Sequence, residues 1–141
     1  MNIDDKLYFI LAKFAAKKST CLKRQYGAII VKRHHVVSMG WNDSAKGLIS
    51  CKKLGYCNRI NVPHNTDYSL CNAVHAEQNA IIKANRKDLI GATLYLYCLE
   101  NGVTISNTEP CNICEGLIRN TGIKEVKTIA PNGEVKTRLI Q

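Results

Sequence analysis

The sequence predicts an α/β fold: a single domain, residues 1–141, arranged as a three-layer α/β/α sandwich around a mixed five-stranded sheet. Three observations predict this fold. The segments follow the order helix, hairpin, helix, strand, helix, strand. The chain is long enough for one sizeable core, and its 45% hydrophobic and 22% charged residues are typical of a globular protein. The strands from Ala92 onward are expected to become parallel through crossover helices.

An amphipathic helix is expected at the start of the chain. Apolar residues recur there at helical spacing, with Asp4 and Asp5 before them and Lys17 and Lys18 after them, so both ends of the helix dipole are complemented. The residues that recur at this spacing are Leu7, Ile10, Leu11, Phe14 and Ala15.

A hairpin and a long insertion follow. Residues 27–32 and 36–41 are short, β-branched segments separated by three residues, which indicates two antiparallel strands. Residues 42–71 form a cysteine-containing insertion loop without sustained periodicity. Because a loop of this length is unusual in a compact domain, something must hold it, and a metal is one physical answer.

The second half of the chain alternates helices and strands. Residues 75–85 predict a helix with Ala76, Ala80 and Ala84 on one face, small enough to approach a sheet closely. Residues 92–98 predict a strand. Pro110 is expected as the first residue of a helix that Gly122 stops. Residues 123–130 and 135–139 predict two more strands with a turn between them, the last one at a sheet edge.

The net charge indicates which class of partner the protein binds, and the cysteine content indicates the cellular compartment. Twenty Lys and Arg against eleven Asp and Glu give a net charge of +9, which favours anions such as nucleotide phosphates, nucleic acid or acidic lipid. No apolar run approaches the ~20 residues that span a bilayer, and no segment is a convincing signal peptide. Seven cysteines without a secretion signal favour metal ligands or core thiols, so a reducing cytoplasm is expected.

The main chemical motif combines His75-Ala76-Glu77 with Pro110-Cys111-Asn112-Ile113-Cys114. Two cysteines three residues apart at the start of a helix present their sulfurs on one face, and the histidine adds a nitrogen from another helix. One nitrogen and two thiolates predict a tetrahedral zinc site with an open fourth position, as in catalytic zinc sites. The carboxyl of Glu77 is close enough to exchange protons with a water at that position.

A structural site is the alternative interpretation of the same motif. A closed zinc knuckle would use His75, Cys111, Cys114 and one further cysteine, and Glu77 would then be a solvated helix residue.

The motif HAE followed by PCxxC is the signature of zinc nucleobase deaminases. The sequence resembles the cytidine and deoxycytidylate deaminase superfamily, and most narrowly the deoxycytidylate (dCMP) deaminases of bacteria and phages. Cys21 and the long insertion before HAE point to this narrower group. The segments that carry the resemblance are residues 19–21, 27–31, 40–42, 71–77 and 109–114.

The resemblance implies a cytidine deaminase-like fold and a zinc-dependent hydrolysis. His75, Cys111 and Cys114 would bind the catalytic zinc, and Glu77 would be the catalytic proton shuttle. Zinc hydroxide would attack C4 of the cytosine ring of dCMP, and dUMP and ammonia would be the products.

The resemblance also implies how the nucleotide is held. Asn42 matches the family asparagine that contacts the sugar, while the backbone N–H of Ala76 and the carbonyl of Glu109 match groups that hold the pyrimidine edge. By position alone, the candidate cations for the phosphate are Lys23, Arg24, Lys46 and Lys53.

A second, structural zinc and a homo-oligomer are further implications, since such family members often carry that zinc and are often hexamers. Candidate ligands for the second zinc are Cys21, Cys51 and Cys71, together with Cys57 or His64. Cys98 lies within a strand-like segment and is expected in the core.

Two other functions remain open from the sequence. A nucleic-acid deaminase acting on tRNA adenosine or on cytosine is similar in its Gly-Trp-Asn and Glu-Pro-Cys segments and fits the basic charge, although its path from the asparagine to HAE is usually much shorter. A nucleic-acid-binding module with only structural zinc would not depend on Glu77.

Overall fold

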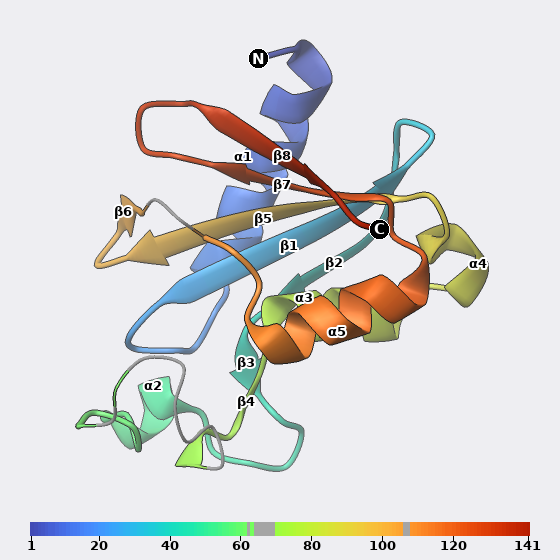
Figure 1. The fold of residues 1–141 in the computed structure, drawn as a ribbon. Helices are drawn as coiled ribbons and strands as arrows, with labels where there is room; N and C mark the ends of the chain where they lie inside the picture. The colour runs from blue at the N-terminus through green and yellow to red at the C-terminus, as the bar shows by residue number, and fades with distance from the viewer. Residues whose placement is uncertain (62, 64–69, 106–107) are drawn as a thin grey trace.

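A mixed sheet forms the centre of the computed structural model, which describes residues 1–61, 63, 70–105 and 108–141 (Figure 1). Its strands are β1 (Gln25–Lys32), β2 (His35–Trp41), β5 (Thr93–Glu100), β6 (Val103–Thr104), β7 (Glu125–Ile129) and β8 (Val135–Leu139). Five of them lie in the order β2-β1-β5-β7-β8, and the short β6 pairs with β5. β5 and β7 are parallel and the other neighbours antiparallel, so the predicted mixed sheet is confirmed. The expectation of parallel strands from Ala92 onward was wrong for β8, which a short turn, rather than a crossover helix, joins to β7.

Helices cover both faces of this sheet, which confirms the three layers (Figure 1). α1 (Ile3–Lys17) packs on one face, and α3 (Ala76–Lys83) and α5 (Asn112–Thr121) lie on the other. Successive residues of a strand point to opposite faces. Ile30 of β1 therefore belongs to the core beneath α3 and α5, whereas its neighbour Ile29 belongs to the core beneath α1.

The buried face of α1 is not the one that the apolar spacing suggested. An apolar stripe ordinarily faces the core, yet Leu7, Ile10 and Phe14 are 49%, 45% and 60% exposed. A second stripe, rich in alanine, allows the helix to approach the sheet more closely and is buried instead. Its members are Asp5, Tyr8, Phe9, Ala12, Ala15 and Ala16.

Two glycines let the helices lie directly on the sheet. A Cβ at Gly27 of β1 would come within 2.0 Å of the Ala12 carbonyl oxygen in α1, and one at Gly40 of β2 within 2.4 Å of the Ala80 nitrogen in α3. Both distances are far inside van der Waals contact, so only glycine fits. Beside Gly40, the Ser38 hydroxyl donates a hydrogen bond to the Ala80 carbonyl (2.5 Å), which fixes α3 on β2.

The β1–β2 hairpin has a shorter turn than the sequence suggested. Arg33 and His34 alone form the turn, both with positive φ (50° and 64°), as in the two-residue turns that match strand twist. The pairing register shifts between Ile30 and Val31, where a bulge interrupts the ladder.

The insertion that was expected as a loop contains regular structure. β3 (Asp43–Ser44) pairs with β4 (Ala73–Val74), so its two ends are held together, and α2 (Cys51–Leu54) lies between them. The Thr20 hydroxyl donates to Asp43 (2.5 Å), which ties the entry of the insertion to the segment before β1. Backbone pairing therefore anchors the insertion at its base.

The helices of the second half begin and end near their predicted limits. His75 is the N-cap of α3, and a separate short helix, α4 (Arg86–Leu89), follows it. Pro110 is not the first helical residue: Cys111 is the N-cap and α5 begins after it. Gly122 ends α5, as predicted, and the structure shows it in the left-handed conformation. Among the described residues, no helix has the length and apolar character needed to cross a membrane.

Candidate active site

Three metal-ligand side chains converge where the N-termini of α3 and α5 meet. Cys111 is the N-cap of α5 and Cys114 lies in its first turn, while His75 caps α3. The His75 Nδ1 atom lies 3.2 Å from the Cys114 sulfur and 3.5 Å from the Cys111 sulfur. The three ligand atoms all lie within 4.8 Å of one another, close enough to share one ion.

Local hydrogen bonds hold the histidine in place before any metal binds. The His75 backbone N–H donates to the Gln78 side-chain oxygen (2.9 Å), half of a capping box. The Asn79 side chain donates to the Trp41 carbonyl (2.8 Å) and so ties α3 to the end of β2. The His75 side chain is thus positioned by the sheet as well as by its own helix.

The two thiols of the site shift each other's pKa in opposite directions. A hydrogen bond from Cys114 is the main reason that the pKa of the Cys111 thiol falls to about 3, with His75 acting in the same direction and burial against it. The pKa of Cys114 is raised, because its thiol donates that hydrogen bond and is itself buried. A divalent cation would release the remaining proton, as thiolate ligation requires.

The histidine and the carboxyl beside it are also perturbed. The hydrogen bond to Cys111 raises the pKa of His75, against the effect of burial. Glu77 is only 4% exposed, and its burial raises its pKa. A buried carboxyl with a raised pKa next to a metal-ligand group is typical of a general acid and base.

A cavity of about 670 Å³ opens onto this group. The walls include Cys111, His75 and Glu77, and all three residues expected to hold substrate also line it. These are Asn42, Ala76 and Glu109. The structure therefore brings the predicted metal ligands, the proton shuttle and the substrate contacts to one place.

Asn42 has a clear structural role at the cavity wall. Its side-chain oxygen accepts from the Tyr26 backbone N–H (2.8 Å), and its amide nitrogen donates to the Arg24 carbonyl (2.9 Å). The residue is 8% exposed. It therefore fixes the start of β1, and each of its polar atoms has capacity for a second hydrogen bond.

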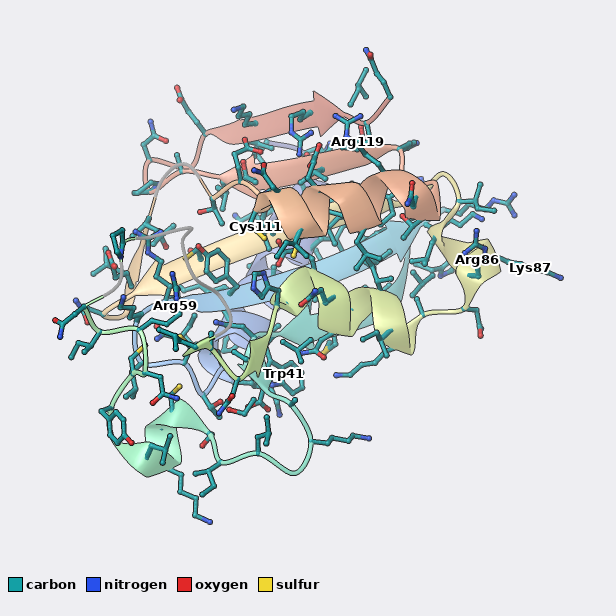
Figure 2. The ribbon with its side chains drawn as sticks, turned by 60° about the horizontal axis from the view of Figure 1, so that its bottom comes forward. Trp41, Arg59, Arg86, Lys87, Cys111 and Arg119 are labelled. Atoms are coloured by element: carbon teal, nitrogen blue, oxygen red, sulfur yellow. The ribbon has the colours of Figure 1, made fainter. Side chains whose placement is uncertain are left out.

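Three cations line the same cavity, and one of them was not predicted. Lys23 and Arg24 come from the segment before β1, whereas Arg59 comes from the insertion. Figure 2 labels Arg59 and Cys111 toward the same end of the sheet, far from Arg86. No motif marks Arg59, because only the fold of the insertion brings it to the cavity. Two predicted cations, Lys46 and Lys53, are not among the lining residues.

The residues proposed for a second zinc are only partly gathered. Cys21, Cys57 and Cys71 line the cavity, and Cys51 is buried nearby. Burial, and then the charges of the other three thiols, raise the pKa of Cys51. Within the described residues, these cysteines do not form a group with three ligand atoms at metal-binding separation. His64 lies outside the described residues.

Cys98 is 1% exposed, on β5, and its predicted place in the core is confirmed.

Known proteins resemble this chain in sequence and in fold. The family model of the cytidine and deoxycytidylate deaminase zinc-binding region matches residues 2–130. Deoxycytidylate deaminase of Mycobacterium phage D29 is 36% identical over 126 residues, which cover 86% of this chain and 91% of that protein. The crystal structure of the dCMP deaminase from cyanophage S-TIM5 in complex with dCMP and dUMP has a TM-score of 0.65 at 25% identity, covering 92% of this chain and 84% of that one.

Some relatives are much longer than the chain. Deoxycytidylate deaminase of Saccharomyces cerevisiae is 36% identical over 122 residues, and the chain spans 36% of its length. The enzyme of Schizosaccharomyces pombe is 35% identical, and the chain spans 35% of its length. The family match nevertheless includes every residue from Asn2 to Ala130, and hence the whole group of His75, Cys111 and Cys114. The chain therefore belongs to the cytidine and deoxycytidylate deaminase family.

Proposed function

We propose that the protein is a zinc-dependent hydrolytic deaminase that converts dCMP to dUMP and ammonia. The observation that carries this proposal is the placement of a buried carboxyl, Glu77, beside three converging metal ligands on one cavity wall. The names of the relatives, which include phage and yeast deoxycytidylate deaminases, support the choice of substrate.

The donor set fits zinc. One imidazole nitrogen and two thiolates from His75, Cys111 and Cys114 suit zinc in number and softness, and three protein ligands leave a fourth position for solvent. When bound, zinc would lower the pKa of a water ligand enough for it to act as a nucleophile at neutral pH.

Glu77 would move the protons of the reaction. Its carboxylate takes a proton from the attacking water and delivers it to N3 of the cytosine ring. It then takes the second proton of that water, from the oxygen now bonded to C4, and gives it to the amino group, which leaves C4 as ammonia while the C4 carbonyl forms. Burial raises the pKa of Glu77, so its carboxyl holds a proton between these two transfers more readily than a solvated one.

Backbone groups would orient the base. Ala76 is the first residue of α3, so its N–H has no acceptor within the helix and faces the cavity end of that helix. Glu109, which also lines the cavity, would offer its carbonyl as an acceptor, and Asn42 would contribute its remaining hydrogen-bonding capacity to the sugar. The backbone donor of Ala76 and the backbone acceptor of Glu109 together match the hydrogen-bonding edge of a pyrimidine base.

Cations on the cavity wall could hold the phosphate of a mononucleotide. Lys23, Arg24 and Arg59 line the cavity beside three acidic residues, and Arg24 pairs with one of these, Glu100. Lys23 and Arg59 would therefore attract the phosphate locally, although the wall as a whole carries as many acidic as basic side chains. A nucleic-acid substrate would instead engage many phosphates along an exposed surface and would show a steep dependence of binding on salt.

Ammonia release from dCMP, CMP, deoxycytidine and an adenosine nucleotide tests the proposal. Wild-type protein loaded with zinc is expected to favour dCMP. Glu77→Ala should lose activity by at least about 100-fold, while its zinc content and circular dichroism stay unchanged. Tight, salt-sensitive binding of tRNA or single-stranded DNA would support the nucleic-acid alternative. Absence of ammonia from every cytosine nucleotide would refute the enzyme.

The remaining proposals concern a second zinc, self-association and location. We propose a structural zinc near Cys51, supported by the gathering of Cys21, Cys57 and Cys71 on one cavity wall. A homo-oligomer is supported by the exposed apolar stripe of α1. The cytoplasmic location rests on the seven cysteines, all free in this structure.

A further inference from the structure

The segment that carries both cysteine ligands is bracketed by two acidic residues. Glu109 lies two residues before Cys111, and Glu115 lies directly after Cys114. Both reach the same guanidinium, that of Arg138 on β8, although it follows them by 29 and 23 residues in the chain. The C-terminal edge strand is thereby connected to both ends of the ligand segment.

The contacts of this guanidinium are specific. Arg138 Nη1 and Nη2 donate to the two carboxylate oxygens of Glu115 at 2.8 Å each, a bidentate pair. Its Nε donates to a carboxylate oxygen of Glu109 at 3.3 Å. The side chains of Arg138 and Glu115 are 29% and 22% exposed, so the pair is sheltered from solvent on most of its surface. Bidentate, charge-assisted pairs are stronger and more directional than ordinary surface ion pairs.

In the part of the chain that the structure describes, apolar packing ties the first turn of α5 to the sheet less firmly than it ties the rest of the helix. Ile118, one turn later, is fully buried in the core and anchors the C-terminal half of the helix. In the first turn, Ile113 is 55% exposed, and Cys114 is the buried residue. The side chain of Glu115 therefore supplies a connection that apolar packing does not.

We infer that Arg138 is a positioning residue for the metal centre. It holds the loop before Cys111 through Glu109 and the first turn of α5 through Glu115, so that both thiols and the Glu109 carbonyl are in place before metal and substrate bind. This inference rests on the proposed function, since it concerns the same centre. Groups outside the ligand shell typically change metal affinity by about 10–100-fold when they are removed.

The rate at which zinc passes to a chromogenic chelator tests this role at a temperature where every variant is folded. Arg138→Gln should release zinc about tenfold faster or more. Glu115→Gln should show a smaller increase, because Glu109 still binds the guanidinium. Adding Glu115→Gln to Arg138→Gln should cause little further increase, since the contact between α5 and β8 is already lost and the other pair of Glu115, with Arg119, lies within α5 itself. Arg138→Lys should release zinc at a rate between those of Arg138→Gln and wild type. Its ammonium keeps the positive charge but cannot bind both carboxylates as the guanidinium does.

Two control variants lie on the same strand. Lys136→Gln removes a contact to Glu109 alone, from a side chain that is 67% exposed, and should leave zinc release nearly unchanged. Val135→Ala weakens the packing of β8 against the core beneath α1 without touching the acidic pair. It should lower thermal stability while zinc release stays at the wild-type rate.

Wild-type zinc release from Arg138→Gln would overturn the inference, as would equal release from Arg138→Gln and Val135→Ala. If Arg138→Gln does not fold, Glu115→Gln decides the matter in the same comparison, and a wild-type rate then overturns it. Failure of the proposed function is distinguishable: zinc-loaded wild type would release no ammonia from dCMP, whatever the order of the zinc-release rates.

Discussion

Gly40 lies where β2 passes beneath α3, the helix that carries His75 at its start, and Gly40→Ala tests how closely that packing controls the site. A Cβ at this position would lie 2.4 Å from the Ala80 nitrogen and 2.5 Å from the Ala76 carbonyl oxygen. Both are helix backbone atoms, which cannot rotate away. To restore a contact of about 3.4 Å, α3 must retreat by about 1 Å.

This displacement has two expected costs. Overpacking of a core contact costs about 1–3 kcal/mol of the free energy of unfolding. Because α3 also carries Ala76 and Glu77 toward the cavity, a shift of about 1 Å should lower kcat for dCMP deamination by about 100-fold. Urea unfolding measures the first effect, and ammonia release with zinc-loaded protein measures the second.

Gly116→Ala is the matched control. This glycine lies in the interior of α5 and a Cβ there would meet nothing within 4 Å. The same substitution should therefore increase the free energy of unfolding by about 1 kcal/mol through helix propensity and leave kcat unchanged. If Gly40→Ala matched wild type in both stability and kcat, the close contact between α3 and β2 would not position the site.

Three further predictions concern the cavity, the second metal and the surface of α1. Arg59→Ala should raise KM for dCMP about tenfold or more while deoxycytidine kinetics stay unchanged. Lys53 does not line the cavity, so Lys53→Ala should alter the kinetics of neither substrate. Equal effects of Arg59→Ala on both substrates would argue against phosphate binding by Arg59. Metal analysis of purified protein should give two zinc ions per chain and one for Cys51→Ser, and one ion in both would refute the second site. Leu7→Glu, on the exposed stripe, should lower the mass measured by sedimentation equilibrium without loss of helix content; an unchanged mass would refute a role for this stripe in assembly.

Local patterns were reliable where neighbouring residues decide the structure. The short spacings of His75 and Glu77, and of Cys111 and Cys114, bring each pair to the start of one helix, where His75 and Cys111 are the N-caps of α3 and α5. The fold then brings His75 within metal-ligand distance of both cysteines. The same holds for Gly122, whose left-handed conformation ends α5.

The apolar spacing gave a wrong prediction for α1, where two faces of the same helix could be buried. α1 has two apolar stripes, and helical spacing alone favours the one with larger side chains, which includes Leu7 and Phe14. The alanine-rich stripe is buried instead because Gly27 on β1 admits the Ala12 backbone at very short range. That choice depends on a strand which the helix meets only in the folded protein.

The sequence by itself determined which groups the centre can offer: a nitrogen and two sulfurs that can act as metal ligands, and a carboxyl two residues after the histidine. Only the tertiary structure decided what surrounds it, since Arg59 reaches the cavity through the insertion and Arg138 reaches Glu109 and Glu115 through an edge strand. The types of these residues and their short spacings are properties of the sequence, and they do not depend on how the helices pack. Contacts between distant segments form only when burial of the core brings those segments together.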